Sequence, residues 1–107
     1  MIRVYHNSKF LKYMFDKDSL KEAAMKLAAV VETFDLDEAY KLTNNIDTPW
    51  PANEGVEATG LSLRSTSVGD VLVKGMTYYV VESEGYRELT DTEACSLKDT
   101  THEHIKM

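Results

Sequence analysis

The sequence predicts an α+β fold, a small single domain in which a mostly antiparallel sheet of about four strands packs with two or three short helices. Three observations lead to this prediction: short segments of alternating apolar residues, segments with apolar residues at helical spacing after capping residues, and a two-residue turn that begins with glycine between two strand-like segments. At 107 residues, 43% of them hydrophobic, the chain can bury one core without disulfides or metals. We place this domain at residues 1–92 and expect residues 93–107 to form a mobile C-terminal tail.

The N-terminal residues predict a strand followed by a short helix. Residues 2–6 alternate and include β-branched and aromatic side chains, which is typical of a strand. Asn7 and Ser8 can cap a helical turn. The apolar side chains that follow recur one and four residues apart and predict an amphipathic helix, at Phe10, Leu11, Met14 and Phe15.

The next segment predicts a second helix and then a strand. Ser19 and Glu22 have the spacing of a capping box, so we expect a helix over residues 20–25. Residues 27–33 are ambiguous, because their alanines favour helix whereas their β-branched side chains favour strand. We expect a strand over this segment.

The clearest helix begins after Asp35. Asp35 is a good N-cap, and Glu38 stands three residues later, as in a capping box. One face at helical spacing follows, made of Leu36, Ala39, Tyr40, Thr43 and Ile46. Residues 47–63 contain Pro49 and Pro51 and predict a long loop, of the kind that often carries a function or is mobile.

The C-terminal half predicts a β-hairpin. Residues 68–74 and 77–82 read as strands, and Gly75-Met76 reads as a type II′ turn between them. We expect one face of the hairpin to carry Val71, Val73, Tyr79 and Val81, and the other to carry Leu72, Tyr78 and Val80. Residues 85–89 predict a short last strand, and from Thr90 onward the periodicity is lost.

The charge distribution bears on the kind of partner. The net charge is −6, with six basic and three acidic side chains in residues 1–31 but one basic and seven acidic in residues 32–63. An acidic chain does not gain the counterion release that drives most nucleic-acid binding, so nucleic acid is a disfavoured partner. The longest strongly apolar stretch, Leu27 to Val31, is too short to span a membrane.

The chain start and its cysteine content predict a cytoplasmic protein. Residues 1–5 have neither the apolar core nor the cleavage site of a signal peptide. The single cysteine, Cys95, cannot form an internal disulfide, which agrees with a reducing compartment.

The sequence holds no catalytic, cofactor or metal signature. His102-Glu103-His104 lacks the i, i+4 helical spacing of a zinc protease motif. We interpret His6 as a sheet or surface histidine rather than a general base. We therefore assign no catalytic residue, no metal ligand and no cofactor, and the sequence favours a non-enzymatic role without deciding it.

Two segments are candidate binding sites. Arg64, Ser65, Thr66 and Ser67 could hold a phosphate or carboxylate, or they could simply begin a strand whose hydroxyls satisfy backbone groups. Trp50 could anchor a protein partner or fold as a lid onto the core. A partner surface at the Trp50 loop would also include the acidic side chains of Asp35, Asp37 and Glu54. The acidic stretches at 32–38, 54–57 and 82–93 either imitate a nucleic-acid phosphate track or solvate a face.

Several motifs taken together resemble small hypothetical proteins of bacteriophages and mobile elements. They are Arg3–Leu11, Asp35–Asp47 with Trp50 and Asn53–Val56, and Arg64–Val71. The last of these, followed by Tyr78–Val81 and Gly85-Tyr86, looks like the strand pair of YodL-like small phage proteins.

The resemblance implies a context rather than a reaction. It implies a non-enzymatic, phage-encoded accessory protein in the cytoplasm of the bacterial host, which binds a host or phage protein; inhibition of a host defence system is one version. The alternative is a domain that binds a small ligand, nucleotide or anion through residues 64–67. The sequence does not predict the oligomeric state of the protein.

Overall fold

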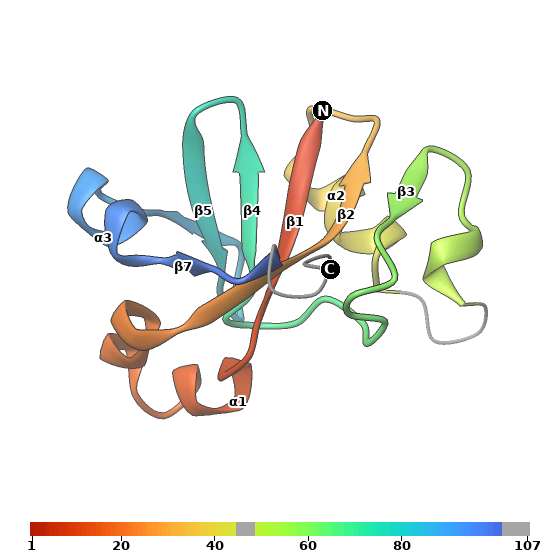
Figure 1. Ribbon diagram of the computed structural model, residues 1–107. Coiled ribbons are helices and arrows are strands. Elements are labelled where there is room, and N and C mark those ends of the chain that lie inside the picture. Colours follow the sequence, from red (N-terminus) through yellow and green to blue (C-terminus); the bar gives the residue numbers. More distant parts are fainter. Residues whose placement is uncertain (45–48, 102–107) are drawn as a thin grey trace.

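A curved seven-stranded sheet organises residues 1–44 and 49–101, the part of the chain that the computed structural model describes (Figure 1). The strand order is β3-β2-β1-β4-β5-β6, and β7 pairs separately with β2. The strands are β1 (Ile2–Asn7), β2 (Ala24–Val31), β3 (Val56–Ala58), β4 (Val71–Lys74), β5 (Thr77–Val81), β6 (Tyr86–Glu88) and β7 (Lys98–Asp99). All pairs are antiparallel except β2 with β7.

The expected α+β fold is confirmed, but about four strands was too few. The additional strands are two or three residues long, and such short segments leave no alternation to detect in a sequence. The long loop expected over residues 47–63 contains one of them, β3, and also a single 3-10 turn, η2 (Trp50–Ala52). Pairing with the neighbouring strand β2, rather than local propensity, makes β3 a strand.

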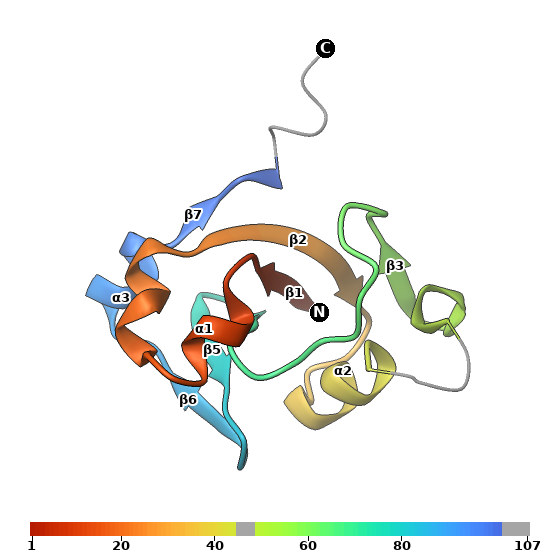
Figure 2. The same cartoon turned by 90° about the horizontal axis from the view of Figure 1, so that it is seen from below.

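Strand β1 lies at the centre of the sheet between β2 and β4. A bulge interrupts its pairing with β2, because Val4 pairs with Ala29 whereas Tyr5 pairs with Leu27, which leaves Ala28 as the extra residue. Bulges increase local twist. Seen from below, β2 arches over β1 and gives the sheet its curvature (Figure 2).

The predicted hairpin is confirmed, but its faces were assigned wrongly. Val71 pairs with Val80 and Leu72 pairs with Tyr79, around a turn in which Gly75 has a φ of 62°. Residues paired across antiparallel strands project to the same face. Val71 and Val80 therefore share a face, and Leu72 and Tyr79 share the opposite one.

The helices are short and differ in part from the expected ones. They are α1 (Phe10–Tyr13), the 3-10 helix η1 (Lys17–Glu22), α2 (Leu36–Leu42) and α3 (Asp91–Ser96). Asp35 caps α2 as predicted, but its carboxylate accepts from the amide of Asp37 and the box with Glu38 does not form. The cap of η1 is Asp16 rather than Ser19, whose buried hydroxyl has no hydrogen-bond partner among the described residues.

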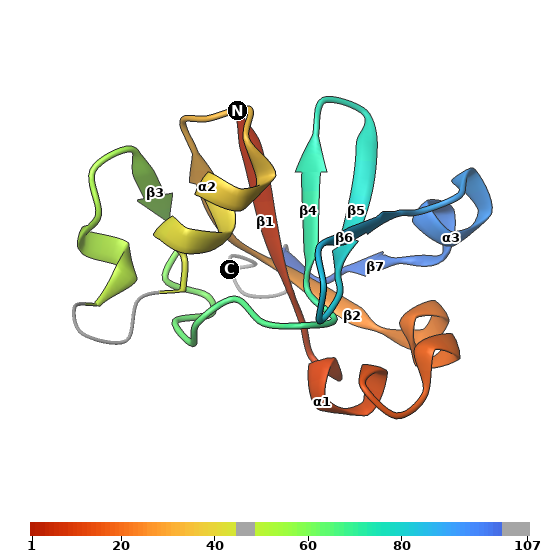
Figure 3. The ribbon, with the colours of Figure 1, turned by 180° about the vertical axis from the view of Figure 1, so that it is seen from behind.

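The sheet buries a core on each face. Seen from behind, α2 lies across β1 and β2 (Figure 3). Leu36, Tyr40 and Leu42 of this helix pack against the first core. That core includes Ile2, Val4, Ala29, Val31, Ala39, Trp50, Leu72 and Val81. The second core, on the other face, includes Tyr5, Tyr13, Leu20, Met25, Val71, Val73, Val80 and Leu89.

The segment expected as a tail carries regular structure up to residue 101. Helix α3 begins with a capping box in which Thr90 and Glu93 exchange side-chain and backbone hydrogen bonds. Strand β7 then pairs in parallel with the start of β2. The tail prediction rested on lost periodicity. It missed the local capping signal of Thr90 and Glu93 that begins α3, and it missed β7 because pairing with the distant strand β2 defines that strand. His102-Glu103-His104 lies outside the described residues.

No helix within residues 1–44 and 49–101 has both the length and the apolar character needed to cross a membrane.

Candidate functional site

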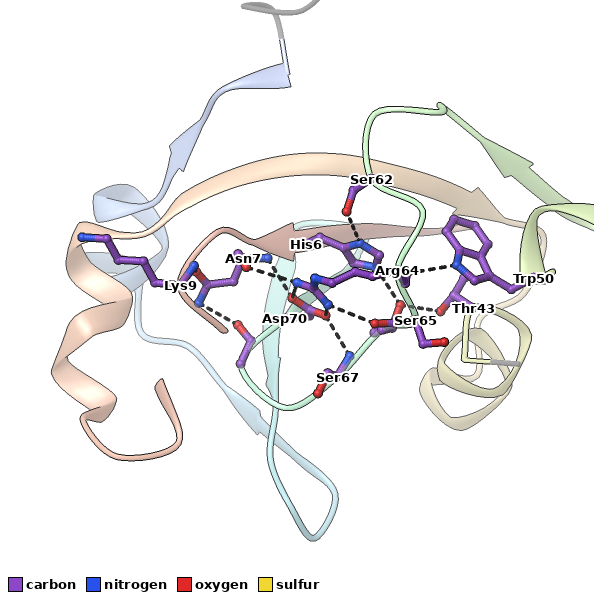
Figure 4. A network of polar contacts seen from close by, with 12 residues as sticks. His6, Asn7, Lys9, Thr43, Trp50, Ser62, Arg64, Ser65, Ser67 and Asp70 are labelled. Carbon is purple, nitrogen blue, oxygen red and sulfur yellow. Dashed lines mark hydrogen bonds and ion pairs between the residues drawn. The ribbon is translucent and has the colours of Figure 1, made fainter. Parts of the chain in front are cut away.

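The segment between β3 and β4 crosses the lower end of the sheet and meets the end of β1 (Figure 2). It brings residues 62–70 against His6 and Asn7, about sixty positions away in the sequence. Two connected groups of polar contacts form there (Figure 4). We call them the Arg64 clasp (Arg64, Asp70, Asn7, Ser67) and the His6 chain (Ser62, His6, Thr66, Thr43).

The Arg64 clasp is an ion pair with every carboxylate lone-pair direction in use. Both guanidinium nitrogens of Arg64 donate to Asp70, at 2.7 Å and 2.6 Å. Asp70, which is fully buried, also accepts from the backbone amides of Asn7 and Ser67. The guanidinium stacks on the ring of Phe10, 3.7 Å from its centroid. This clasp fixes the start of β4 and the N-terminus of α1 to the end of β1.

The clasp argues against the expected anion site. A guanidinium that already forms a bidentate pair with a buried carboxylate has no fork left for a phosphate. Of the other predicted residues, Thr66 is buried in the His6 chain. The backbone carbonyl of Ser65 accepts a hydrogen bond from Arg64, and the backbone amide of Ser67 donates one to Asp70. Residues 64–67 lead toward β4, which begins at Val71. Their polar groups are engaged within the protein, but the Thr66 hydroxyl pairs with the side chains of His6 and Thr43 and not with the backbone groups that the alternative interpretation expected.

The His6 chain has one consistent set of proton positions. The hydroxyl of Thr43 donates to the carbonyl of Ala39 at 2.8 Å, so Thr43 Oγ1 can only accept from Thr66. Thr66 thereby uses its proton, and Thr66 Oγ1 must accept from His6 Nε2 at 3.0 Å. Neutral His6 then carries its proton on Nε2. Its Nδ1 accepts from Ser62 Oγ, 2.7 Å away.

Burial keeps His6 neutral. Desolvation lowers the pKa of His6 from 6.5 to about 4, against the opposing influence of the Asp70 carboxylate. The positive charge of Arg64 lowers the pKa further. The imidazole is thus an uncharged acceptor at neutral pH. The structure agrees with the prediction that His6 lies in a sheet, and it adds two side-chain partners that the sequence did not reveal.

Trp50 belongs to the core and is not a surface anchor. Its side chain is 2% exposed, and its indole N–H donates to the carbonyls of Leu63 and Arg64, both at 3.0 Å. Its ring meets His6 edge-on, with 6.2 Å between centroids. Of the two interpretations of Trp50, the lid folded onto the core is correct. It cannot contact a partner without unfolding this end of the domain.

The acidic residues predicted beside Trp50 do lie at the surface. Asp35, Asp37 and Glu54 are exposed. Asp35 is engaged as the cap of α2, and Asp37 accepts from the hydroxyl of Tyr86 at 2.9 Å. Without Trp50, this surface keeps Phe34, 70% exposed, as its large apolar side chain.

A small pocket opens beside the His6 chain. Its volume is about 130 Å³. Lys26 and His6 are register partners on β2 and β1, so their side chains project to the same face, and both line the pocket. The remaining lining residues are Asn7, Ser8, Phe10, Leu61, Ser62 and Arg64.

A second surface feature lies on and just after α1. Leu11, Met14 and Phe15 are 62%, 55% and 91% exposed. Their i, i+3 and i+4 spacing places them on one side of the turn. The opposite side is held by buried Tyr13 and by Phe10 under Arg64. We call Leu11, Met14 and Phe15 the α1 apolar surface.

Exposed charged residues lie close in sequence to the α1 apolar surface. They are Lys9, Lys12, Lys17 and Lys21, together with Asp16 and Asp18. Lys17 forms an exposed ion pair with Glu82 at 3.3 Å. The sequence pattern grouped Leu11, Met14 and Phe15 with Phe10 as the apolar residues of one amphipathic helix. Only the packing of α1 shows which residues of the helix point outward.

Searches for related proteins returned no matching family model, no matching curated protein and no matching solved structure. Among residues 1–44 and 49–101, no three His, Cys, Asp or Glu side chains gather closely enough to hold a metal ion. Function is therefore argued from the geometry of these two surface features.

Proposed function

We propose that this chain is a non-enzymatic, phage-encoded accessory protein that binds a host or phage protein, and that the α1 apolar surface makes the contact. The observation that carries the proposal is the exposure of three large apolar side chains on and just after a short helix, Leu11, Met14 and Phe15. Exposed apolar side chains that gather in one place typically mark an interaction site. Inhibition of a host defence system is one version of this function.

The exposure of these side chains is not an accident of a loose helix. Helix α1 is fixed from its other side by Tyr13, which is fully buried and whose hydroxyl donates to Glu82 at 3.2 Å. Gly69 lies so close to α1 that an added Cβ would be 3.0 Å from the Cβ of Tyr13. The apolar surface is therefore presented by a rigid support, which reduces the ordering cost of binding.

Lysines outnumber the carboxylates of Asp16 and Asp18 over residues 9–21, and this excess of positive charge indicates the chemistry of the partner. Lys9, Lys12 and Lys21 have no ion pair among the described residues. A partner with an apolar groove and carboxylates at its rim would bury Phe15 and place acidic groups near these lysines. This surface replaces the one expected at Trp50, Asp35, Asp37 and Glu54, because Trp50 is buried.

Affinity capture of the tagged chain from bacterial lysate, with and without phage infection and read by mass spectrometry, tests the proposal. Phe15→Asp disrupts the α1 apolar surface, and Phe34→Asp is the matched control because Phe34 is a similarly exposed phenylalanine elsewhere. We expect a partner that the wild type and F34D retain and that F15D loses. A partner retained equally by F15D, or lost only with F34D, would contradict this assignment.

A second candidate function is the binding of a small anionic ligand in the pocket beside His6. Lys26 supplies a positive charge there, and Ser8 supplies a hydroxyl donor. Bound ligand stabilises the folded state by linkage, so a thermal-shift screen with phosphate, nucleotides and small dicarboxylates tests it. No rise in melting temperature at millimolar ligand would end this candidate, and loss of a rise in Lys26→Gln would support it.

A further inference from the structure

Ser62 and His6 are arranged as a hydroxyl nucleophile and its base. The proton positions of the His6 chain direct the Ser62 hydroxyl proton to His6 Nδ1, 2.7 Å away. Thr66 Oγ1 holds the other ring nitrogen, and Thr43 in turn holds Thr66. A nucleophile within hydrogen-bond reach of a base that a third group orients is the shared geometry of covalent hydrolases. Here a threonine takes the orienting place that a carboxylate often occupies.

Ser62 is the accessible member of the His6 chain. Ser62 is half-buried and lines the pocket of about 130 Å³, whereas His6, Thr66 and Thr43 are buried. Ser62 Oγ meets Nδ1 of the imidazole (Figure 4), whereas Thr66 Oγ1 meets Nε2. A small molecule in the pocket can thus reach Ser62 Oγ without displacing the residues that orient His6.

The pocket also selects for charge. Lys26 is the register partner of His6 and lines the same pocket, while the charge of Arg64 is balanced by buried Asp70. A cation beside the nucleophile favours a negatively charged substrate and the oxyanion that forms during acyl transfer.

From these contacts we propose that Ser62 is a nucleophile, with His6 as its base, for small negatively charged esters that have a good leaving group such as a phenol. The inference rests on the pocket of the second candidate function and is independent of the α1 apolar surface.

The reaction balances with water as the only co-reactant. Ser62 Oγ attacks the ester carbonyl carbon and its proton moves to His6 Nδ1. The carbon–oxygen bond to the leaving group breaks, and the leaving oxygen takes the proton from Nδ1, which leaves an acyl-Ser62 ester. Water, deprotonated through the same Nδ1, then releases the acid and restores the serine. Because burial makes the imidazolium a stronger acid than usual, it returns its proton readily, and the attack depends on an activated acyl group.

The probe is mono(4-nitrophenyl) succinate, with neutral 4-nitrophenyl acetate beside it. The full-length chain carries Cys95→Ser, because the exposed Cys95 thiol would also be acylated. Adducts are located by peptide mass spectrometry. Ser8 is the internal control, since it lines the same pocket but is not one of the hydrogen-bond partners of the His6 ring among the described residues.

We expect Ser62 to be acylated about 10² to 10⁴ times faster than Ser8, the usual contribution of a positioned base. Ser62→Ala should remove the adduct, whereas Ser8→Ala should keep it. Lys26→Gln should reduce the preference for the succinate over the acetate. Acylation of Ser62 no faster than of Ser8 would overturn the proposal, whether or not small anions raise the melting temperature.

If His6→Gln fails to fold, the role of His6 as the base is tested in the protein that retains His6, by measuring the rate of Ser62 acylation as a function of pH. The charged groups that face His6 are Asp70, Arg64 and Lys26. With His6 as an unprotonated base, the acylation rate should be level from about pH 6 to pH 8. A serine without a base would instead react about tenfold faster for each pH unit, and that slope would refute the role of His6.

Discussion

Acidification should unfold this domain earlier than its carboxylates alone would require, because His6 is buried in its neutral form. The pKa of His6 is about 4 in the folded chain and 6.5 without burial. Between these values the unfolded chain binds more protons than the folded one, so the free energy of unfolding rises with pH across this window. The stability that neutral His6 contributes is fully present above about pH 6.5 and is lost as the pH falls toward 4. Below about pH 4, His6 causes no further loss.

The magnitude follows from the two pKa values. Integrating the difference in bound protons from pH 7.5 down to pH 5 gives a loss of about 2 kcal/mol for this one side chain. Stopping at pH 5 keeps most carboxylates ionised. A loss of this size is a large fraction of the stability of a small domain.

Urea denaturation at the two pH values measures the effect. Trp50 is the only tryptophan and is 2% exposed, so its fluorescence reports unfolding of the core next to His6. His6→Gln retains an N–H that can reach Thr66 but has no group that titrates near neutrality. Its free energy of unfolding should change by about 2 kcal/mol less between pH 7.5 and pH 5 than that of the wild type. Parallel losses in both proteins would refute the reasoning, because shared contributions from other groups cancel in the comparison.

Three substitutions test the packing around this site, each by urea denaturation read from tryptophan fluorescence. Asp70→Asn should cost roughly 3 kcal/mol, because it leaves a part-buried guanidinium without its charge partner; a loss below 1 kcal/mol would contradict the clasp. Thr43→Val should cost about 1–3 kcal/mol by removing the acceptor of a buried hydroxyl, while Thr77→Val in β5 should be nearly neutral. Gly69→Ala should destabilise more than Gly60→Ala: both glycines have positive φ, but only at Gly69 would the added Cβ meet α1, at 3.0 Å. Equal losses of unfolding free energy in the two variants would show that α1 can move away from the added Cβ without destabilising the domain.

Local sequence patterns were sufficient where the structure is local. The alternation of residues 2–6 predicts β1, and the two-residue turn at Gly75-Met76 predicts the hairpin. That turn also fixes the register, since Lys74 must then pair with Thr77 and Val71 with Val80. The hairpin faces were assigned wrongly because strand alternation was applied without this pairing, so the sequence did contain the correct answer.

Patterns failed where a neighbour decides the outcome. Phe10, Leu11, Met14 and Phe15 look alike in sequence, yet Phe10 packs under Arg64 while Phe15 is 91% exposed. Similarly, Arg64 reads as a free anion-binding side chain until its pairing with Asp70 is known. Asp70 is separated from Arg64 by one turn, and Arg64 is separated from Phe10 by about half of the chain. No spacing rule predicts either contact.

The sequence by itself determined the α+β class, the strand β1, the hairpin and the start of α2, because periodicity, turn chemistry and capping act within a few residues. Only the tertiary structure decided that His6 meets Ser62 and Thr66, that Trp50 is core rather than surface, and that Leu11, Met14 and Phe15 face outward. The physical reason is the same for all three. The curvature of the sheet brings residues 59–70 against the end of β1, and that arrangement arises from the burial of two cores rather than from any local signal.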